Sequence, residues 1–181
     1  MSIRALIILH PGFEEIEAVV AIDLLSRANI DVVQAALNDT LLVRGRSDIT
    51  LQATHRLRDI TNEVFDVVIL PGGPGITHIR KHPLICKQFE QQRHSNQLIG
   101  CICAAPLLLL DAQLHTDLRY TCHPTAADEL PDALGAAVVQ DGLIITSRGA
   151  GTATEFALHI ISQLTDQTTA DAIAESICLP E

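Results

Sequence analysis

The chain has 181 residues, of which 48% are hydrophobic and 3% aromatic, so its core must be built mainly of Ala, Leu, Ile and Val. A formal net charge of −10 and a pI near 5.1 argue against nucleic acid or an acidic membrane surface as a partner. The five cysteines include no CxxC pair, a usage typical of a reducing compartment. The apolar run at residues 5–9 is too short for a signal peptide or a membrane span. We therefore expect a cytoplasmic protein with a single domain over residues 1–181.

Short apolar runs alternate with amphipathic segments along the chain. The first of them predict strands over residues 4–10 and 31–36, with a helix over residues 14–27 between them. Residues 41–51 predict a short hairpin or an excursion at the edge of the sheet around Gly45. The remaining predicted elements are strands over residues 65–70 and 98–102, helices over 83–95 and 106–112, a hairpin over 137–146, and closing helices over 151–164 and 168–176. Apolar strands separated by helices predict an α/β fold with a mostly parallel sheet covered on both faces.

The most informative position is Cys103, which follows a predicted strand and precedes a helix that begins at Pro106. Proline is tolerated in the first turn of a helix because its missing N–H would be unpaired there. A thiol at such a turn faces the free N–H groups of the helix, and these donors and the helix dipole favour the thiolate. The alternative is that Cys103 is a small buried hydrophobic residue, as intracellular cysteines often are.

Three predicted strands end in residues suited to chemistry, at His10–Gly12, at Pro71–Gly73 and at Cys103. If these strands are parallel, their ends share one edge of the sheet, where ligands bind in such folds. The pair Gly72–Gly73 lets backbone N–H groups approach a ligand closely, as an oxyanion hole requires, although it also fits an ordinary tight turn.

The first predicted helix begins with the acidic residues Glu14, Glu15 and Glu17. They could simply complement the positive end of the helix on a solvated face. Glu17 differs because its neighbours Ile16 and Val20 are expected to face the interior. A carboxyl group placed there is expected to be protonated or paired, which is what proton transfer needs.

Along nearly its whole length the chain resembles the DJ-1/PfpI superfamily, specifically the DJ-1/YajL branch. The matching stretches are residues 4–17, 66–73, 103–106, 122–124 and 141–152, in the order and spacing of that family. The resemblance implies a flavodoxin-like three-layer sandwich and a homodimer. It also implies that Cys103 is the nucleophile, that Glu17 hydrogen-bonds its sulfur, and that His123 is the nearby histidine. The backbone N–H groups of Gly73 and Ala104 would be the oxyanion donors.

Such a site suits attack on an activated carbonyl. We expect Cys103 to form a hemithioacetal with a small α-oxoaldehyde such as methylglyoxal, and Glu17 to act as general acid and base before hydrolysis releases lactate. This is cofactor-free, glutathione-independent glyoxalase chemistry, by a lyase or hydrolase. The family is also credited with deglycase activity on early glycation adducts of proteins and nucleotides.

Glu17 and Cys103 are expected to titrate as a coupled pair. An ionised Glu17 would raise the pKa of the thiol, whereas a protonated Glu17 would donate to the thiolate and lower it. His123 either orients the thiol or carries a proton, or is only a structural hydrogen-bonding residue. No metal site and no cofactor are expected, since the other histidines singled out lie in unlike contexts; these are His10, His78 and His159.

Three other functions remain open. Cys103 could be a redox or oxidative-stress sensor that is oxidised to a sulfinate stabilised by Glu17 and the helix N-terminus. A chaperone or binding module with a non-catalytic thiol has no positive sign in the sequence. The third is a cysteine peptidase or amidase, as in the PfpI branch, but those relatives place a histidine directly after the nucleophile, where this chain has Ala104.

The chain departs from the family near the mouth of the site. Many relatives have an arginine where this chain has Ser47, with Arg46 one residue earlier. A slip of one residue in a strand reverses the face of a side chain, so the preferred substrate charge stays open. Cys101 and Cys122 are candidate resolving thiols. Strand alternation places Cys101 on the same side as Cys103, although core packing is the alternative role for Cys101.

Overall fold

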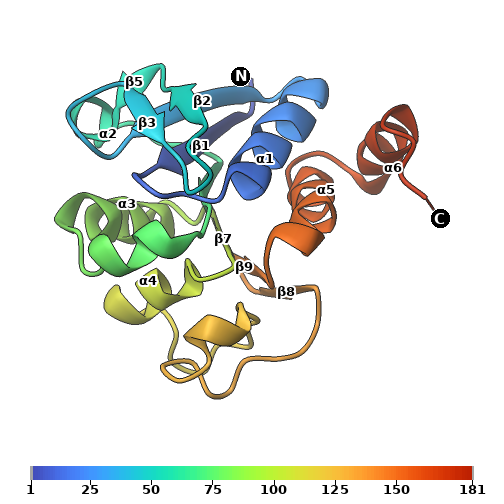
Figure 1. Ribbon diagram of the computed structural model, residues 1–181. Coiled ribbons are helices and arrows are strands. Elements are labelled where there is room, and N and C mark those ends of the chain that lie inside the picture. The colour runs from blue at the N-terminus through green and yellow to red at the C-terminus, as the bar shows by residue number, and fades with distance from the viewer. Residues whose placement is uncertain (1, 181) are drawn as a thin grey trace.

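The computed structural model describes residues 2–180, which form a sheet between two layers of helices (Figure 1). The strands are β1 (Arg4–Leu9), β2 (Asp31–Ala36), β3 (Leu42–Arg44), β4 (Thr50–Gln52), β5 (His55–Arg56), β6 (Val67–Leu70), β7 (Leu98–Ile102), β8 (Val138–Asp141) and β9 (Ile144–Ser147). The helices are α1 (Glu15–Arg27), α2 (Leu57–Ile60), α3 (Pro83–His94), α4 (Pro106–Asp111), α5 (Ala153–Leu164) and α6 (Gln167–Ser176). Three short 3₁₀ turns are η1 (Pro74–His78), η2 (Pro124–Ala126) and η3 (Ala150–Thr152).

The main sheet has seven strands in the order β5-β2-β1-β6-β7-β9-β8. All neighbours in it pair in parallel except β8 and β9, which are antiparallel. Strands β3 and β4 form a separate antiparallel hairpin, as the sequence predicts. The strand order reverses around β1, because β2 lies on one side of it and β6 on the other. The carboxyl ends of β1, β6 and β7 therefore adjoin at one edge, where α/β sheets bind ligands.

Helices α1 and α5 cover one face of the sheet, with α6 packed against α5, and α2, α3 and α4 cover the other face (Figure 1). The core on the first face includes Phe156 and Leu25, and the core on the second includes Phe89 and Leu108. Strands β6 and β7 are buried along their whole length, which explains why their sequences are continuous apolar runs. The predicted three-layer α/β sandwich with a mostly parallel sheet is confirmed.

The predicted elements are found with their ends displaced by a few residues at most. The elements β5 and α2 and the 3₁₀ turns have no counterpart in the prediction, because segments of two to five residues are too short to show a hydrophobic period. The last hairpin turns at residues 142–143, because Asp141 still pairs with Ile144 and Gly142 takes a φ of 56°.

The prediction that Ile16 faces the interior is wrong, since its side chain is 53% exposed. Helix α1 instead buries the face that carries Glu17, Ala18, Ala21 and Leu24. The small alanine side chains on this face allow α1 to pack against α5. The inward position predicted for the glutamate is therefore found, although the isoleucine next to it points outward.

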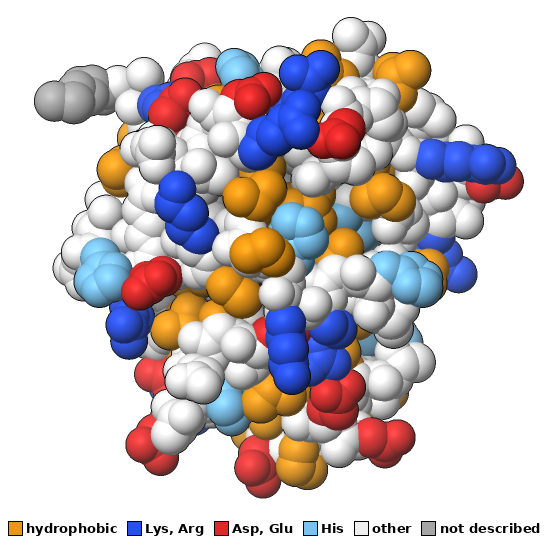
Figure 2. All heavy atoms as spheres, turned by 90° about the vertical axis from the view of Figure 1, so that its left-hand side faces the viewer, with side chains coloured by type: hydrophobic (Ala, Val, Ile, Leu, Met, Phe, Trp, Pro, Cys, Tyr) orange, Lys and Arg blue, Asp and Glu red, His pale blue; other side chains and the backbone are white. Residues whose placement is uncertain are grey.

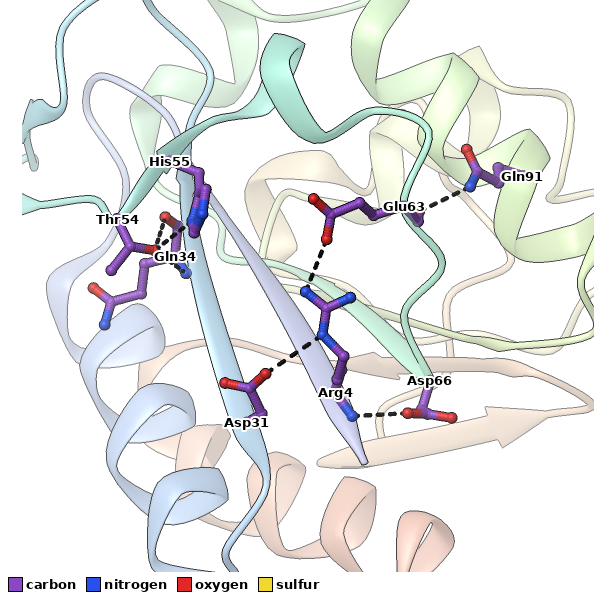
Figure 3. A network of polar contacts seen from close by, with 8 residues as sticks. All are labelled: Arg4, Asp31, Gln34, Thr54, His55, Glu63, Asp66 and Gln91. Carbon is purple, nitrogen blue, oxygen red and sulfur yellow. Dashed lines mark hydrogen bonds and ion pairs between the residues drawn. The ribbon is translucent and has the colours of Figure 1, made fainter. Parts of the chain in front are cut away.

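At the amino end of the sheet, Arg4 joins β1 to two neighbouring segments, the start of β2 and the stretch that precedes β6 (Figure 3). Its guanidinium pairs with Glu63 at 2.8 Å and with Asp31 at 3.4 Å, and it lies over the ring of Phe65 at 4.7 Å. Its backbone N–H donates to the carboxylate of Asp66 at 2.7 Å. This cluster fixes the edge of the sheet opposite to the carboxyl ends of β1, β6 and β7.

The face that α2, α3 and α4 cover carries charges of both signs (Figure 2). Hydrophobic side chains and histidines gather near its middle, and basic side chains lie singly or in pairs among acidic ones. Within residues 2–180, no helix is both long enough and apolar enough to cross a membrane.

Candidate active site

Cys103 comes directly after β7 and takes a φ of 64°, a conformation that a residue with a side chain rarely adopts. Its N–H donates to the carbonyl of Ser147 at 2.9 Å, and its own carbonyl accepts the N–H of His123 at 2.8 Å. This left-handed turn takes the side chain out of the alternation of β7. The prediction that Cys101 and Cys103 share a side is therefore wrong: Cys103 packs against the core under α1 and α5, whereas Cys101 is buried in the opposite core.

The loop after β6 approaches Cys103 so closely that it has room only for glycine. A Cβ on Gly72 would lie 2.6 Å from the Cβ of Cys103, and one on Gly73 would lie 2.5 Å from the carbonyl oxygen of Gly12. Gly73 also has a φ of 100°, which glycine adopts without strain. The backbone N–H groups of Gly73 and Ala104 lie close enough to the Cys103 sulfur to lower the pKa of its thiol. The structure thus aims two amide donors at the thiol.

Glu17 reaches the same point from the first turn of α1, where its side chain is 1% exposed. Its Oε2 accepts the backbone N–H of Gly72 at 2.7 Å. Its other oxygen, Oε1, is buried and accepts no conventional hydrogen bond, and the carboxyl group lies beside the Cys103 thiol. The inward turn of α1 and the Gly72 loop together bring an acid and a sulfur into contact.

The environment changes the acidity of both groups. Burial raises the pKa of Glu17 to about 7, against the opposing effect of the Gly72 N–H. Burial, and next the charge of an ionised Glu17, raise the pKa of the Cys103 thiol to about 12, although the N–H groups of Gly73 and Ala104 lower it. The sequence predicts that the donors at the helix end lower the pKa of the Cys103 thiol. In the structure the pKa is instead raised. Two negative charges, one on Glu17 and one on Cys103, are unfavourable at this distance. The two groups together therefore release one proton near neutral pH and share the proton that remains.

His123 lies at the edge of the same site, immediately before η2. Its Nδ1 accepts the backbone N–H of Thr125 at 3.2 Å and contacts the Thr125 hydroxyl at 2.8 Å. In a neutral imidazole, an accepting Nδ1 leaves the proton on Nε2. His123 is thus held by Thr125 and by its backbone hydrogen bond to Cys103, which fits both roles considered for it from the sequence.

These groups line one cavity of about 370 Å³. Its volume falls in the lower part of the range of small-molecule sites. The lining residues are Glu14, Glu17, Arg46, Gly73, Pro74, Ile76, Thr77, Cys103, Ala104, Leu107, His123, Thr125 and Ala150. The cavity joins a thiol, a carboxyl group, an imidazole and backbone donors, a set that can attack a carbonyl and move protons on the adduct.

Arg46 lines this cavity. Its guanidinium pairs with Glu14 at 3.0 Å, and its backbone N–H donates to the carbonyl of Phe13. Arg46 and Ser47 lie in a turn and not in a strand, so an offset of one residue does not reverse the direction of the side chain. Ser47 donates its N–H to Glu15, which is buried and does not lie on a solvated face. The cavity therefore has a cation at its mouth.

The other thiols lie away from this cavity. Cys101 and Cys122 both belong to the core under α3 and α4, and neither lines the cavity. Burial raises the pKa of both. Core packing, the alternative role considered for Cys101, agrees with this placement. In the part of the chain that the structure describes, no three His, Cys, Asp or Glu residues are grouped so as to hold a metal ion.

Sequence reasoning placed His10 at the end of a strand but did not predict its contacts, and its side chain is fully buried. Its Nε2 lies 3.1 Å from the carbonyl oxygen of Pro71, and its Nδ1 lies 3.2 Å from that of Pro11. The ring thus bridges the loops after β1 and β6. The available signal was a histidine that ends a buried strand directly before a proline.

The fold and site define a class of parallel α/β sandwich with a strained cysteine between a sheet and a helix. The model of the DJ-1/PfpI family matches residues 3–163. Protein dj-1beta of Drosophila melanogaster is 36% identical over 182 residues, which cover 98% of this chain and 97% of the relative. Glutathione-independent glyoxalase DJR-1.2 of Caenorhabditis elegans is 36% identical over 180 residues, which cover 97% of this chain and 96% of the relative.

A solved structure gives the same result. The crystal structure of Drosophila melanogaster DJ-1beta superposes with a TM-score of 0.95 at 35% identity, and the match covers 100% of both chains. This chain belongs to the DJ-1/PfpI family, and its fold is the flavodoxin-like α/β fold of that family.

Proposed function

We propose that this protein is a glutathione-independent glyoxalase that converts methylglyoxal to lactate through Cys103. One observation carries the proposal: a carboxyl group with a pKa near 7, that of Glu17, lies beside the thiol in a cavity with backbone donors. An acid that titrates near neutral pH is suited to accept and return a proton. The relative named a glutathione-independent glyoxalase supports the reaction class.

The first step is addition to the aldehyde. The Cys103 thiolate forms a bond from sulfur to the aldehyde carbon, and the carbonyl electron pair moves to oxygen. Protonated Glu17 gives its proton to that oxygen, which yields a hemithioacetal and leaves Glu17 ionised. The N–H groups of Gly73 and Ala104, which lie near the sulfur and lower its pKa, would stabilise the new alkoxide.

The second step is an internal redox isomerisation. Ionised Glu17 removes the proton from the carbon bonded to sulfur, and the electrons form an enediol as the ketone oxygen takes a proton from solvent or from Nε2 of His123. Glu17 then returns its proton to the former ketone carbon, and the first hydroxyl loses its proton as a carbonyl forms. The carbon bonded to sulfur is oxidised to a thioester and its neighbour is reduced to an alcohol. No external oxidant or reductant is needed.

Hydrolysis completes the cycle. Water adds to the thioester, the bond from carbon to sulfur breaks, and lactate leaves as Cys103 regains its starting form. Purified protein supplied with methylglyoxal and no glutathione should release one lactate for each methylglyoxal consumed. Unchanged turnover in the Cys103→Ala variant would exclude this function. A deglycase activity would act on the same thiol, with a glycated amine in place of the aldehyde.

A redox role for Cys103 is the second candidate, because two N–H donors and an acid with a pKa near 7 surround a partly exposed sulfur. Mild peroxide would supply the oxidant, and the same donors would stabilise the sulfinate oxygens. Intact-mass measurement after peroxide should then show two added oxygens confined to Cys103. The peptidase alternative is weaker, since Nδ1 of His123 is already used by Thr125.

We further propose that the protein is a homodimer. Four exposed hydrophobic side chains lie on α1 and near the β3–β4 hairpin: Ile16, Val19, Leu42 and Ile49. The hairpin lies against the segment that leads into α1, because the N–H of Gly12 donates to the carbonyl of Arg44 at 2.8 Å. Apolar side chains on neighbouring elements favour burial by a partner. Sedimentation equilibrium should give twice the chain mass, and a monomer at all concentrations would contradict the proposal.

A further inference from the structure

Three of the four segments that carry the site continue into one ion cluster on the side of α4; the fourth is α1 with Glu17. In each of the three, a site residue is followed, within eight positions, by a charged residue of this cluster. The three pairs are Gly73 and Arg80, Cys103 and Asp111, and His123 and Glu129. The cluster therefore joins the loop after β6, the helix after the nucleophile and the loop after the histidine.

Arg80 makes the central contacts of the cluster. Its Nε and Nη2 donate to the two oxygens of Asp111 at 2.7 and 2.8 Å, and its Nη1 donates to both oxygens of Glu129 at 2.8 and 2.9 Å. The backbone N–H of Lys81 donates to Asp111 at 2.8 Å. The planar guanidinium thus holds two carboxylates in one fixed geometry, which lysine cannot reproduce.

Burial distinguishes this cluster from ordinary surface ion pairs. The side chain of Asp111 is 2% exposed and that of Arg80 is 23% exposed. Burial raises the pKa of Asp111, but the hydrogen bonds from Arg80 and Lys81 outweigh it and hold this pKa below its ordinary value. A buried carboxylate that lost its partner would be left uncompensated, so the cluster holds its members in place more firmly than an exposed pair would.

We infer that Arg80 is a positioning residue of the candidate active site, which holds the Gly73 N–H and the His123 loop in register with Cys103 through Asp111 and Glu129. Only six residues, 74–79, separate Gly73 from Arg80. A displaced Gly73 N–H would stabilise the thiolate less, and the pKa of the thiol would rise. The inference rests on the proposed nucleophilic role of Cys103. Its test measures the reactivity of the thiol in the absence of substrate.

The test is the pH dependence of Cys103 alkylation by iodoacetamide, followed on the Cys103 peptide by mass spectrometry. Arg80→Lys keeps the positive charge and removes the bidentate geometry. We expect the pKa of Cys103 to rise and its alkylation rate near neutral pH to fall on the order of tenfold, since small displacements at a reacting centre have large effects. A pKa unchanged from that of the unmodified protein in folded Arg80→Lys would overturn the inference.

A second variant separates positioning from simple charge effects. Asp111→Asn removes a negative charge, and Coulomb's law alone would then lower the pKa of Cys103. Positioning predicts the opposite direction, a rise, because the bidentate contact with Arg80 is lost. A lowered pKa would therefore contradict the inference. If Asp111→Asn fails to fold, Glu129→Gln makes the same comparison at a side chain that is 53% exposed.

The matched control is Arg4→Lys, which weakens a comparable cluster at the opposite edge of the sheet (Figure 3). It should lower the free energy of unfolding and leave the pKa of Cys103 unchanged. If the pKa of Cys103 rose equally in Arg4→Lys and Arg80→Lys, the rise would reflect a general loss of stability, and the inference would be overturned. Activity is measured separately. Absence of lactate formation together with the expected alkylation shifts would remove the proposed function and leave the positioning role intact.

Discussion

Glu17 accepts the backbone N–H of Gly72 at 2.7 Å, so the acid beside the nucleophile also anchors the loop that supplies one of the two oxyanion donors, the Gly73 N–H. Three strand ends meet here because β1, β6 and β7 are neighbours in the sheet. The arrangement places the carboxyl group where burial raises its pKa to about 7. Chemistry and stability at this site are therefore linked through one side chain.

The Glu17→Gln variant should be more stable than the unmodified protein in mild alkali, and inactive. A rise in the pKa of Glu17 from 4.5 to about 7 costs the folded state about 3 kcal/mol once the carboxyl group is ionised. Because the folded form binds the proton more tightly, this loss of stability develops as the pH rises from about 4.5 to about 7. The amide carries no such cost but still accepts the Gly72 N–H.

Urea unfolding near pH 5 and near pH 8 checks this prediction. The gain in the free energy of unfolding should be larger at the higher pH. Glu155→Gln, at an exposed position of α5, removes the same charge and should show no comparable gain. Equal effects of the two variants would contradict the raised pKa of Glu17.

Gly72→Ala should inactivate the protein and lower its stability. The new Cβ would lie 2.6 Å from the Cβ of Cys103, and relief of that contact must move the loop or the thiol. We expect a loss of about 1–3 kcal/mol in the free energy of unfolding, typical of overpacking. Gly135→Ala is the control, since a Cβ there meets nothing within 4 Å. Full lactate formation by Gly72→Ala would show that the site tolerates a wider loop.

His10→Asn should make the protein less sensitive to acid while lowering its stability at neutral pH. Burial lowers the pKa of His10 from 6.5, so the unfolded state binds the proton more tightly than the folded state does. The free energy of unfolding therefore decreases as the pH falls below 6.5. The lost hydrogen bond to a loop carbonyl should cost about 1–3 kcal/mol at neutral pH. Urea unfolding at neutral pH tests the loss of stability, and urea unfolding at several pH values below 6.5 tests the reduced sensitivity to acid. The exposed His55→Asn variant should leave both the stability and its pH dependence unchanged.

Arg46→Gln should reduce the preference for substrates that carry a carboxylate. The guanidinium lies at the cavity but is largely exposed, so its interaction with an anion should be worth up to about fivefold in KM. We expect KM to rise for glyoxylate and to stay unchanged for methylglyoxal, which is uncharged. Arg44→Gln, two residues away and outside the cavity lining, should change neither. Equal changes for both substrates would remove the proposed role of this cation.

Much of the fold and site follows from local sequence patterns. Continuous apolar runs mark the buried strands of a parallel sheet, and the glycines after β6 mark a close approach. The direction of a side chain beyond a strand end cannot be predicted in this way. Cys103 leaves the alternation of β7 because its φ is positive, and Arg46 reaches the cavity because it lies in a turn.

Long-range polar contacts are the other part that local patterns do not predict. Arg80 and Asp111 are 31 residues apart, and neither has a sequence signal that names its partner. The pKa of Cys103 depends in the same way on burial and on Glu17, both of which are set by tertiary packing. The donors at the helix end, taken alone, predict a lower pKa for Cys103 than the folded environment gives.

The most direct test of the central claim is the pH profile of Cys103 alkylation in the unmodified protein and in Glu17→Gln. Coupled titration predicts two steps in the unmodified protein, the first near the Glu17 pKa of about 7 and the second in strong alkali. Glu17→Gln should show a single step, at a lower pH than the second step of the unmodified protein, because no carboxylate opposes the thiolate. Identical single-step profiles in the two proteins would show that Glu17 and Cys103 titrate independently, and would contradict the account.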